Sequence, residues 1–244
     1  MARPIPVSGP PVVLVHGWGG SFSRTWQSSG VSMIIEEEGR EVLGVDLLGH
    51  GSAPKSHDPA EYADLTDRVL EALPGGLASD SRVDAVGFSM GALTLLQILA
   101  RHPGRFGKVV LAGIGDGVFS GGSGMSEKVA EALEAQAAGD TGAGAADAGV
   151  RAMLGYASAD GNDPLALAAA MRRPMPSDPV TADRLAAVTT EVLVVIGDGD
   201  FAYPADQLAA AFPNGTLKVL KRVDHFATPE DFGFIDAVVR FLNS

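Results

Sequence analysis

Short apolar runs recur along the chain and alternate with segments of helical composition. The runs are Val12–Val15, Val42–Asp46, Val83–Gly87, Val109–Ala112, Val192–Ile196 and Thr216–Leu220. Helical composition occurs near residues 24–38, 59–73, 90–101, 204–211 and 229–242. Strands that are apolar on both faces and alternate with helices are typical of a parallel sheet covered on both sides. Right-handed crossovers then predict a doubly wound α/β fold with about six strands.

The alternation stops between Ala112 and Glu191, where no strand-like run occurs. In this stretch Ser126–Ala138 and Pro164–Arg173 have helical composition, whereas Asp140–Gly144 and Ser158–Asp163 resemble loops. A plain connection of this length is unusual in a compact domain, and such insertions are commonly functional lids.

We therefore expect residues 1–112 and 191–244 to form one core domain, with residues 113–190 inserted as a helical cap. Gly-rich joints at residues 121–124 and 142–144 would let this cap move. Because the motifs described below all lie outside it, the cap is expected to set substrate specificity and to contribute little to the chemical step.

Composition narrows the possible functions. The net charge of −12 disfavours nucleic acid and anionic membrane surfaces as partners. The absence of cysteine excludes disulfides, a thiolate nucleophile and cysteine-based metal sites. No apolar run approaches the ~20 residues of a membrane span, and the N-terminus lacks the apolar stretch of a signal peptide. We expect a soluble, cytoplasmic protein, and nothing in the sequence indicates its oligomeric state.

A G-x-S-x-G pentapeptide at Gly87–Gly91 has Ser89 at its centre. An apolar strand-like run precedes it and a segment of helical composition follows. This strand–turn–helix context is the one in which such a serine acts as a nucleophile. The glycines are needed because a turn that projects its central side chain brings backbone close to backbone on both sides.

A nucleophilic serine needs a base, and the base needs a carboxylate to hold its tautomer. Among five histidines, His225 alone combines a place after the serine, a place after an acid and a position on a loop beyond the last strand-like run. His16 and His50 are expected to brace turns, and His57 and His102 flank helix ends. We expect His225 to be the base.

The acid has three candidates. Asp198 and Asp200 follow the fifth strand-like run, and Asp116 follows the fourth. Ligand sites of open α/β sheets gather at these carboxyl ends of strands.

The Gly-rich loop Gly17–Gly20, after the first run, can supply a donor to a developing oxyanion. The backbone amides of Trp18 and Met90 are the expected donors. A phosphate-binding loop is disfavoured because neither the Walker sequence nor G-x-G-x-x-G fits. No metal or organic cofactor is expected.

Together these motifs resemble those of the α/β-hydrolase superfamily over nearly the whole chain. His16–Gly20 is similar to the oxyanion loop of that family, and Asp46–Ser52 to its D-x-x-G-x-G-x-S segment. Gly87–Gly91 is similar to the nucleophile elbow. Gly197–Asp200 resembles the G-x-x-D acid loop, in which the last residue is catalytic, so the resemblance favours Asp200 as the acid. His225 matches the histidine loop.

The resemblance implies a sheet of mostly parallel strands and a hydrolase that cleaves a small carboxylic ester, thioester or lactone. A lyase or a carbon–carbon bond hydrolase with the same triad is the alternative, and a non-catalytic ligand-binding member is a third. The short segment before the first run implies that the antiparallel hairpin that usually opens the sheet is missing or reduced. Ser89 argues against haloalkane dehalogenases and epoxide hydrolases, which carry Asp at that position.

Overall fold

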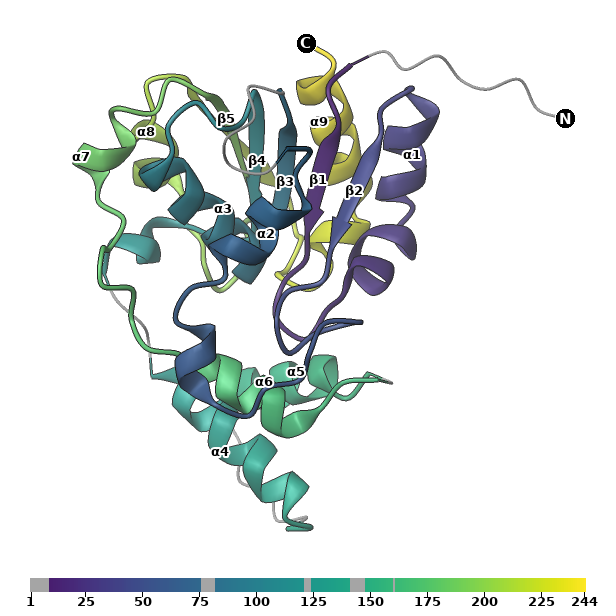
Figure 1. Cartoon of the computed structure of the whole chain (residues 1–244), viewed down its shortest axis with the longest axis vertical. Coiled ribbons are helices and arrows are strands. Elements are labelled where there is room, and N and C mark those ends of the chain that lie inside the picture. Colours follow the sequence, from purple (N-terminus) through teal and green to yellow (C-terminus); the bar gives the residue numbers. More distant parts are fainter. Residues whose placement is uncertain (1–8, 76–81, 121–123, 141–147, 160) are drawn as a thin grey trace, which may run out of the picture.

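The computed structural model of this chain describes residues 9–75, 82–120, 124–140, 148–159 and 161–244. These residues form a six-stranded sheet in the order β2-β1-β3-β4-β5-β6, and all five neighbouring pairs are parallel (Figure 1). The strands are β1 (Val12–Val15), β2 (Val42–Val45), β3 (Asp84–Phe88), β4 (Lys108–Ala112), β5 (Glu191–Gly197) and β6 (Gly215–Leu220). Each expected strand is confirmed to within one residue at either end.

Alternate side chains of the strands enter two separate hydrophobic cores. On one face, residues such as Val13 and Leu111 pack with the helices α2 (Thr66–Ala72), α3 (Met90–Arg101) and α8 (Asp206–Ala210). On the other face, Leu14 and Val110 pack with α1 (Val31–Glu37) and α9 (Phe232–Leu242). Figure 1 shows α1 and α9 on the side of the sheet opposite α2 and α3. The period of two along a strand accounts for this division.

Three of the expected helices are interrupted. Residues 24–38 form a π-helical turn (Phe22–Gln27) and then α1, because Gly30 adopts a left-handed backbone with φ of 81° between them. Residues 59–73 form a 3-10 turn (Pro59–Tyr62) and then α2. Residues 229–242 form a 3-10 turn (Thr228–Glu230) and then α9, which is capped by Asp231. The breaks before α1 and α9 fall where a glycine or a capping carboxylate offers the backbone an alternative to continuing the helix. Before α2, the Asp64 carboxylate accepts from the Thr66 amide at 2.9 Å.

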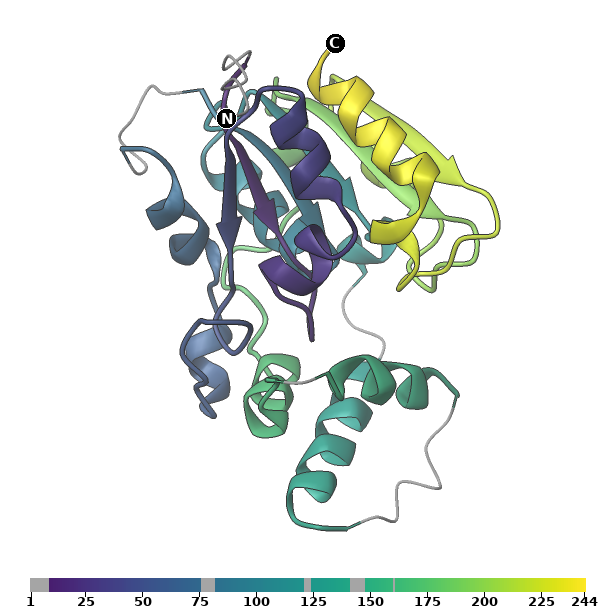
Figure 2. The same ribbon diagram turned by 90° about the vertical axis from the view of Figure 1, so that its right-hand side faces the viewer.

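Helices α4 (Met125–Ala137), α5 (Ala148–Ala157) and α6 (Pro164–Met171) gather on the side to which the strands point (Figures 1 and 2). The expected helices near 126–138 and 164–173 are confirmed. The sequence did not indicate α5, whose two glycines lower helix propensity, nor the short α7 (Ala182–Leu185). Arg172 joins α6 to α4 through Glu134, at 2.9 Å from both carboxylate oxygens, and through Glu127.

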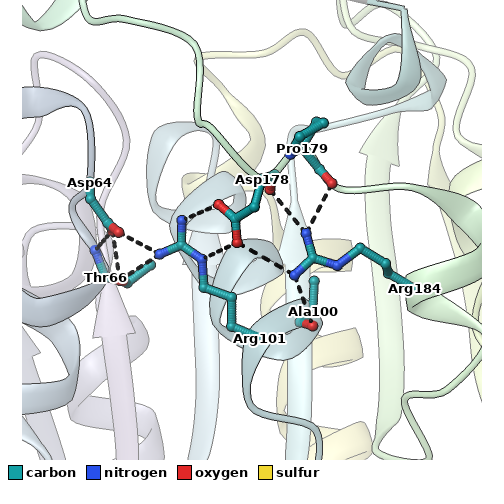
Figure 3. A network of polar contacts seen from close by, with 7 residues as sticks. All are labelled: Asp64, Thr66, Ala100, Arg101, Asp178, Pro179 and Arg184. Carbon is teal, nitrogen blue, oxygen red and sulfur yellow. Dashed lines mark hydrogen bonds and ion pairs between the residues drawn. The ribbon is translucent and has the colours of Figure 1, made fainter.

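The chain returns from these helices along the flank of α3, where a network of charges holds it (Figure 3). Arg101, the last residue of α3, donates to both carboxylate oxygens of Asp178 at 2.7 and 2.9 Å. It also pairs with Asp64, just before α2. Arg184 of α7 donates to the backbone carbonyls of Asp178 and Pro179. The network therefore joins α2, α3 and the segment between α6 and α7.

The division into a core (residues 1–112 and 191–244) and a cap (residues 113–190) stays a prediction. The Gly-rich joints expected at 121–124 and 142–144 lie outside the described residues, except for Gly124, which has φ of 70° directly before α4. The expected loop at 140–144 is likewise described only at Asp140. Residues 158–163 contain no helix or strand where they are described, in agreement with the expected loop.

Candidate active site

Ser89 lies in a strained turn between β3 and α3. Its backbone has φ of 51° and ψ of −113°, one of two positive-φ conformations among the described non-glycine residues. A Cβ added to Gly87 would lie 2.8 Å from the backbone of Ala92, and one added to Gly91 would lie 2.3 Å from the carbonyl oxygen of Val15. The pentapeptide therefore needs its glycines, because β1, β3 and α3 approach one another too closely for side chains there.

His225 connects Ser89 to Asp200. Its Nε2 lies 3.0 Å from the Ser89 hydroxyl, and its Nδ1 lies 2.9 and 3.0 Å from the two carboxylate oxygens of Asp200. His225 and Asp200 are both about 5% exposed. Because a carboxylate only accepts, Nδ1 carries the proton and Nε2 is left to accept from the serine hydroxyl. The structure thus brings together the three residues that the sequence singled out, from the ends of β3, β5 and β6.

The two other candidate acids have different partners. Asp198 accepts from the backbone amide of Arg222 at 2.6 Å and lies 3.5 Å from the ammonium group of Lys221. Asp116 accepts from the backbone amide of Leu208 at 2.9 Å, at the start of α8. Both aspartates therefore hold loops and helix ends, and Asp200 is the carboxylate that faces His225.

Three aromatic rings surround the His225 imidazole. The ring centroids of Phe88 and Phe201 lie 4.9 and 4.2 Å from it, and Phe226 meets it edge-on at 5.5 Å. Phe201 is 70% exposed, which is unusual for a phenylalanine. Sequence reasoning missed Phe201, although its place directly after the candidate acid is a signal. The rings limit the orientations open to the imidazole.

The loop after β1 forms a tight turn whose peptide planes are fixed by hydrogen bonds. The carbonyl oxygen of Gly17 accepts from the Gly20 amide at 3.1 Å and from His16 Nδ1 at 2.7 Å. In a trans peptide this orients the Trp18 N–H, which belongs to the same plane, in the opposite direction. A Cβ on Gly17 would lie 3.1 Å from the Cβ of Ser89, so this turn lies against the serine.

Met90 is the first residue of α3, where amides have no acceptor within the helix. The absence of a side chain at Gly91 lets α3 begin directly against the carbonyls of Val15 and His16, the residues that lead into the turn. Neither the Trp18 nor the Met90 amide donates in the hydrogen bonds found among the described residues. Both amides are thus free to act as donors beside Ser89.

Two histidines near this turn are buried and neutral. His16 Nε2 accepts from the Leu47 amide at 3.1 Å, and burial lowers the pKa of the His16 imidazole. Burial also lowers the pKa of His50 to about 3. His50 Nδ1 lies 2.8 Å from the Leu48 carbonyl, while its Nε2 has no hydrogen-bond partner among the described residues. Both histidines brace loops, as expected, and His16 orients the peptide of a candidate oxyanion donor.

Two further observations concern the described parts of the chain. No group of three or more His, Cys, Asp or Glu side chains within these parts is arranged to hold a metal ion. None of their helices combines the length and the apolar character needed to cross a membrane.

Residues 12–234 match the alpha/beta hydrolase family, so the chain belongs to this family. It is 32% identical over 107 residues to an esterase of Mycobacterium tuberculosis, a match that covers 44% of this chain and 34% of the relative. It is 30% identical over 113 residues to the dihydrolipoyllysine-residue acetyltransferase component of an acetoin cleaving system from Pseudomonas putida, covering 45% of this chain and 29% of the relative. The matches thus span about a third of the length of these curated relatives.

Solved structures agree with the fold over nearly the whole chain. The enol-lactonase from Burkholderia xenovorans superimposes with a TM-score of 0.68 at 23% sequence identity, covering 97% of this chain and 92% of the lactonase. At this level of identity the likeness concerns the fold. It confirms the α/β-hydrolase architecture that the sequence motifs predicted.

Proposed function

We propose that the protein is a serine hydrolase that cleaves a carboxylic ester, a thioester or a lactone through an acyl-enzyme on Ser89. The observation that carries this proposal is the hydrogen-bonded series from Ser89 through His225 to Asp200. A buried imidazole between a hydroxyl and a carboxylate is the arrangement that activates a serine for acyl transfer.

In the proposed mechanism His225 Nε2 takes the proton of Ser89 as Oγ attacks the substrate carbonyl. The Asp200 carboxylate stabilises the imidazolium that forms. The tetrahedral oxyanion accepts from the backbone amides of Trp18 and Met90, and the N-terminus of α3 adds a favourable dipole. His225 then gives its proton to the leaving alcohol, thiol or lactone oxygen. A water activated by the same imidazole hydrolyses the acyl-enzyme.

Acyl substrates are favoured because both candidate donor amides belong to backbone next to Ser89, near where the carbonyl oxygen of an ester would develop charge. The match to a curated esterase supports the same class of reaction. The chemistry needs no cofactor and no metal, since base, nucleophile and oxyanion donors all come from the chain. We further infer that residues 113–190 act as a cap over this site. A lyase or carbon–carbon hydrolase would use the same triad, and substrate profiling separates these reactions from ester cleavage.

The proposal is tested by covalent labelling and turnover. A fluorophosphonate probe should label the parent protein at Ser89, and Ser89→Ala should abolish labelling and lower kcat for p-nitrophenyl acetate by about 10⁴–10⁶-fold. Ser28→Ala, at an exposed serine whose hydroxyl donates to the Ser23 carbonyl, is the control and should retain both. Labelling that persists in Ser89→Ala would contradict the assignment. A parent protein that binds esters without turning them over would indicate the ligand-binding alternative.

A further inference from the structure

Helices α5 and α6, with Asn162 between them, lie against the turn that carries the Trp18 amide and against the helical turn that follows it. Three hydrogen bonds make this contact. The Trp18 indole donates to the Leu167 carbonyl at 3.1 Å, and the Asn162 carboxamide donates to the Gly19 carbonyl at 2.9 Å. From the other side Arg24 donates to the Tyr156 carbonyl at 2.8 Å, with its guanidinium 4.3 Å from the Tyr156 ring centroid.

The hydrogen bond from Asn162 is connected through two peptide planes to the Trp18 amide, the proposed oxyanion donor. The Gly19 carbonyl that accepts from Asn162 belongs to the same peptide as the Gly20 N–H. That N–H donates to the Gly17 carbonyl at 3.1 Å. The Gly17 carbonyl, in turn, belongs to the same peptide as the Trp18 N–H. Each bond both orients the next peptide and polarises it, so the donors strengthen one another along the series.

The geometry points to Asn162 as a positioning residue for the oxyanion hole, which it controls through the hydrogen-bond series Asn162–Gly19/Gly20–Gly17/Trp18. This inference rests on the proposed function. It also revises the expectation that the inserted segment contributes little to the chemical step, because Asn162 lies within residues 113–190.

Asn162 is well supported for this task. Its amide nitrogen also donates to the Ala157 carbonyl at 3.0 Å, so two acceptors fix the carboxamide. The next residue, Asp163, caps α6 by accepting from the amides of Leu165 and Ala166 at 2.9 and 3.1 Å. Groups held by packed helices and second hydrogen bonds keep a site to the tolerance that catalysis needs. The Gly19 carbonyl receives a second, longer donation from Arg24 at 3.5 Å, which cannot replace the first in strength.

The test compares Asn162→Ala and Asn162→Asp with His57→Ala. The His57 imidazole lies 3.0 Å from Asp163, so its removal breaks a neighbouring contact to the start of α6 without touching the turn. For p-nitrophenyl acetate we expect both Asn162 variants to lower kcat about tenfold with KM unchanged, less than the 10²–10³-fold for an oxyanion donor removed outright. His57→Ala should keep kcat within about twofold of the parent value, because the contact that it removes lies away from the oxyanion hole. Circular dichroism and thermal melting verify that all variants are folded.

The inhibition constant of a trifluoromethyl ketone distinguishes a positioning role of Asn162 from a purely structural one. The ketone forms a hemiketal oxyanion on the serine, so its inhibition constant should rise in Asn162→Ala by the same factor as kcat falls. Binding of the uncharged product alcohol should stay constant.

Equal losses in Asn162→Ala and His57→Ala would overturn the inference, as would a loss confined to KM or an unchanged kcat. Ser89-dependent turnover by the parent protein supports the proposed function whatever Asn162 does, so these outcomes overturn the inference alone. Absence of Ser89-dependent turnover overturns both.

Discussion

The two edges of the sheet hold their polar groups in opposite ways. At the amino edge, the buried carboxylate of Asp84 accepts from Arg40 and from the Lys108 amide. Arg40 donates further to the backbone carbonyls of Pro10 and Leu242. At the carboxyl edge, Ser89 is strained, and the Trp18 and Met90 amides donate to no acceptor among the described residues. The amino edge thus pairs a buried charge within the protein, whereas the carboxyl edge leaves two candidate donor amides without an acceptor among the described residues.

This difference indicates that the amino ends of the strands serve stability and the carboxyl ends serve activity. Removing one partner of a buried ion pair leaves an uncompensated charge and costs stability. Strained or unsatisfied groups, by contrast, persist in native proteins mainly where function needs them. Substitutions at the carboxyl edge should therefore reduce activity and leave stability nearly intact, whereas substitutions at the amino edge should do the reverse.

The largest effect is expected for the acid of the proposed triad. Asp200→Asn should lower kcat for p-nitrophenyl acetate by about 10⁴-fold, because an amide holds the wrong tautomer of His225. Asp198→Asn is the matched control on the same loop and should cost less than about tenfold, since Asn can still accept from the Arg222 amide as Asp198 does. Steady-state kinetics with each variant measure the contrast.

The reverse order of effects would transfer the role to Asp198, and small effects in both would indicate Asp116. Urea unfolding should give nearly the parent free energy for Asp200→Asn. A large loss of stability there would contradict the division between the two edges.

The second effect concerns the amino edge. Asp84→Ala should lower the free energy of unfolding by about 3–5 kcal/mol, because Arg40 then remains buried without its counter-charge. Asp236→Ala, which removes an exposed partner of Arg240 one helical turn away, should cost less than about 0.5 kcal/mol. Urea unfolding followed by circular dichroism measures both values. Below the unfolding transition Asp84→Ala should keep the kcat of the parent, and a fall in kcat of folded protein would break the comparison.

The sequence predicted the four inner strands β1, β3, β4 and β5 well because they are almost fully buried on both faces, so that hydrophobicity marks them. The edge strands β2 and β6 are only partly buried. The sequence predicted helix boundaries less well. Gly30 and Asp231 interrupt helices through backbone conformation and capping, which local composition does not fix. The helix α5 has weak intrinsic propensity, and its packing against α4 comes from residues distant in the sequence.

The positions of Ser89, His225, Trp18 and Met90 could be predicted because their proposed roles follow from short motifs at strand ends. The choice between Asp198 and Asp200 could not be made from spacing alone. Two residues of a single turn point to different partners, and only the resemblance favoured Asp200. The contact of Asn162 with Gly19 joins residues 143 apart. No local pattern marks such a contact, so it required the fold.

The smallest expected effect tests whether burial determines how much the Arg40–Asp84 ion pair at the amino edge contributes to stability. The network around Arg101 has similar chemistry, but the Asp178 side chain is 40% exposed, against 4% for Asp84. Hydrogen bonds from Arg101 lower the pKa of Asp178 from its ordinary 3.8 to about 2. A carboxyl group with a depressed pKa in the folded state adds stability above its unfolded pKa, and loses it as the pH falls through the folded pKa.

Asp178→Asn should therefore lower the free energy of unfolding at pH 7 by less than about 1 kcal/mol, since solvent and salt screen exposed pairs. The difference between variant and parent should shrink as the pH falls from about 4 to about 2, because Asp178 of the parent becomes protonated there. It should also shrink in 1 M NaCl at pH 7. Urea unfolding across this pH range, with Asp236→Ala as the exposed control, measures both trends. A loss at pH 7 as large as that of Asp84→Ala would show that the pairing itself, and not its burial, sets the contribution of these ion pairs.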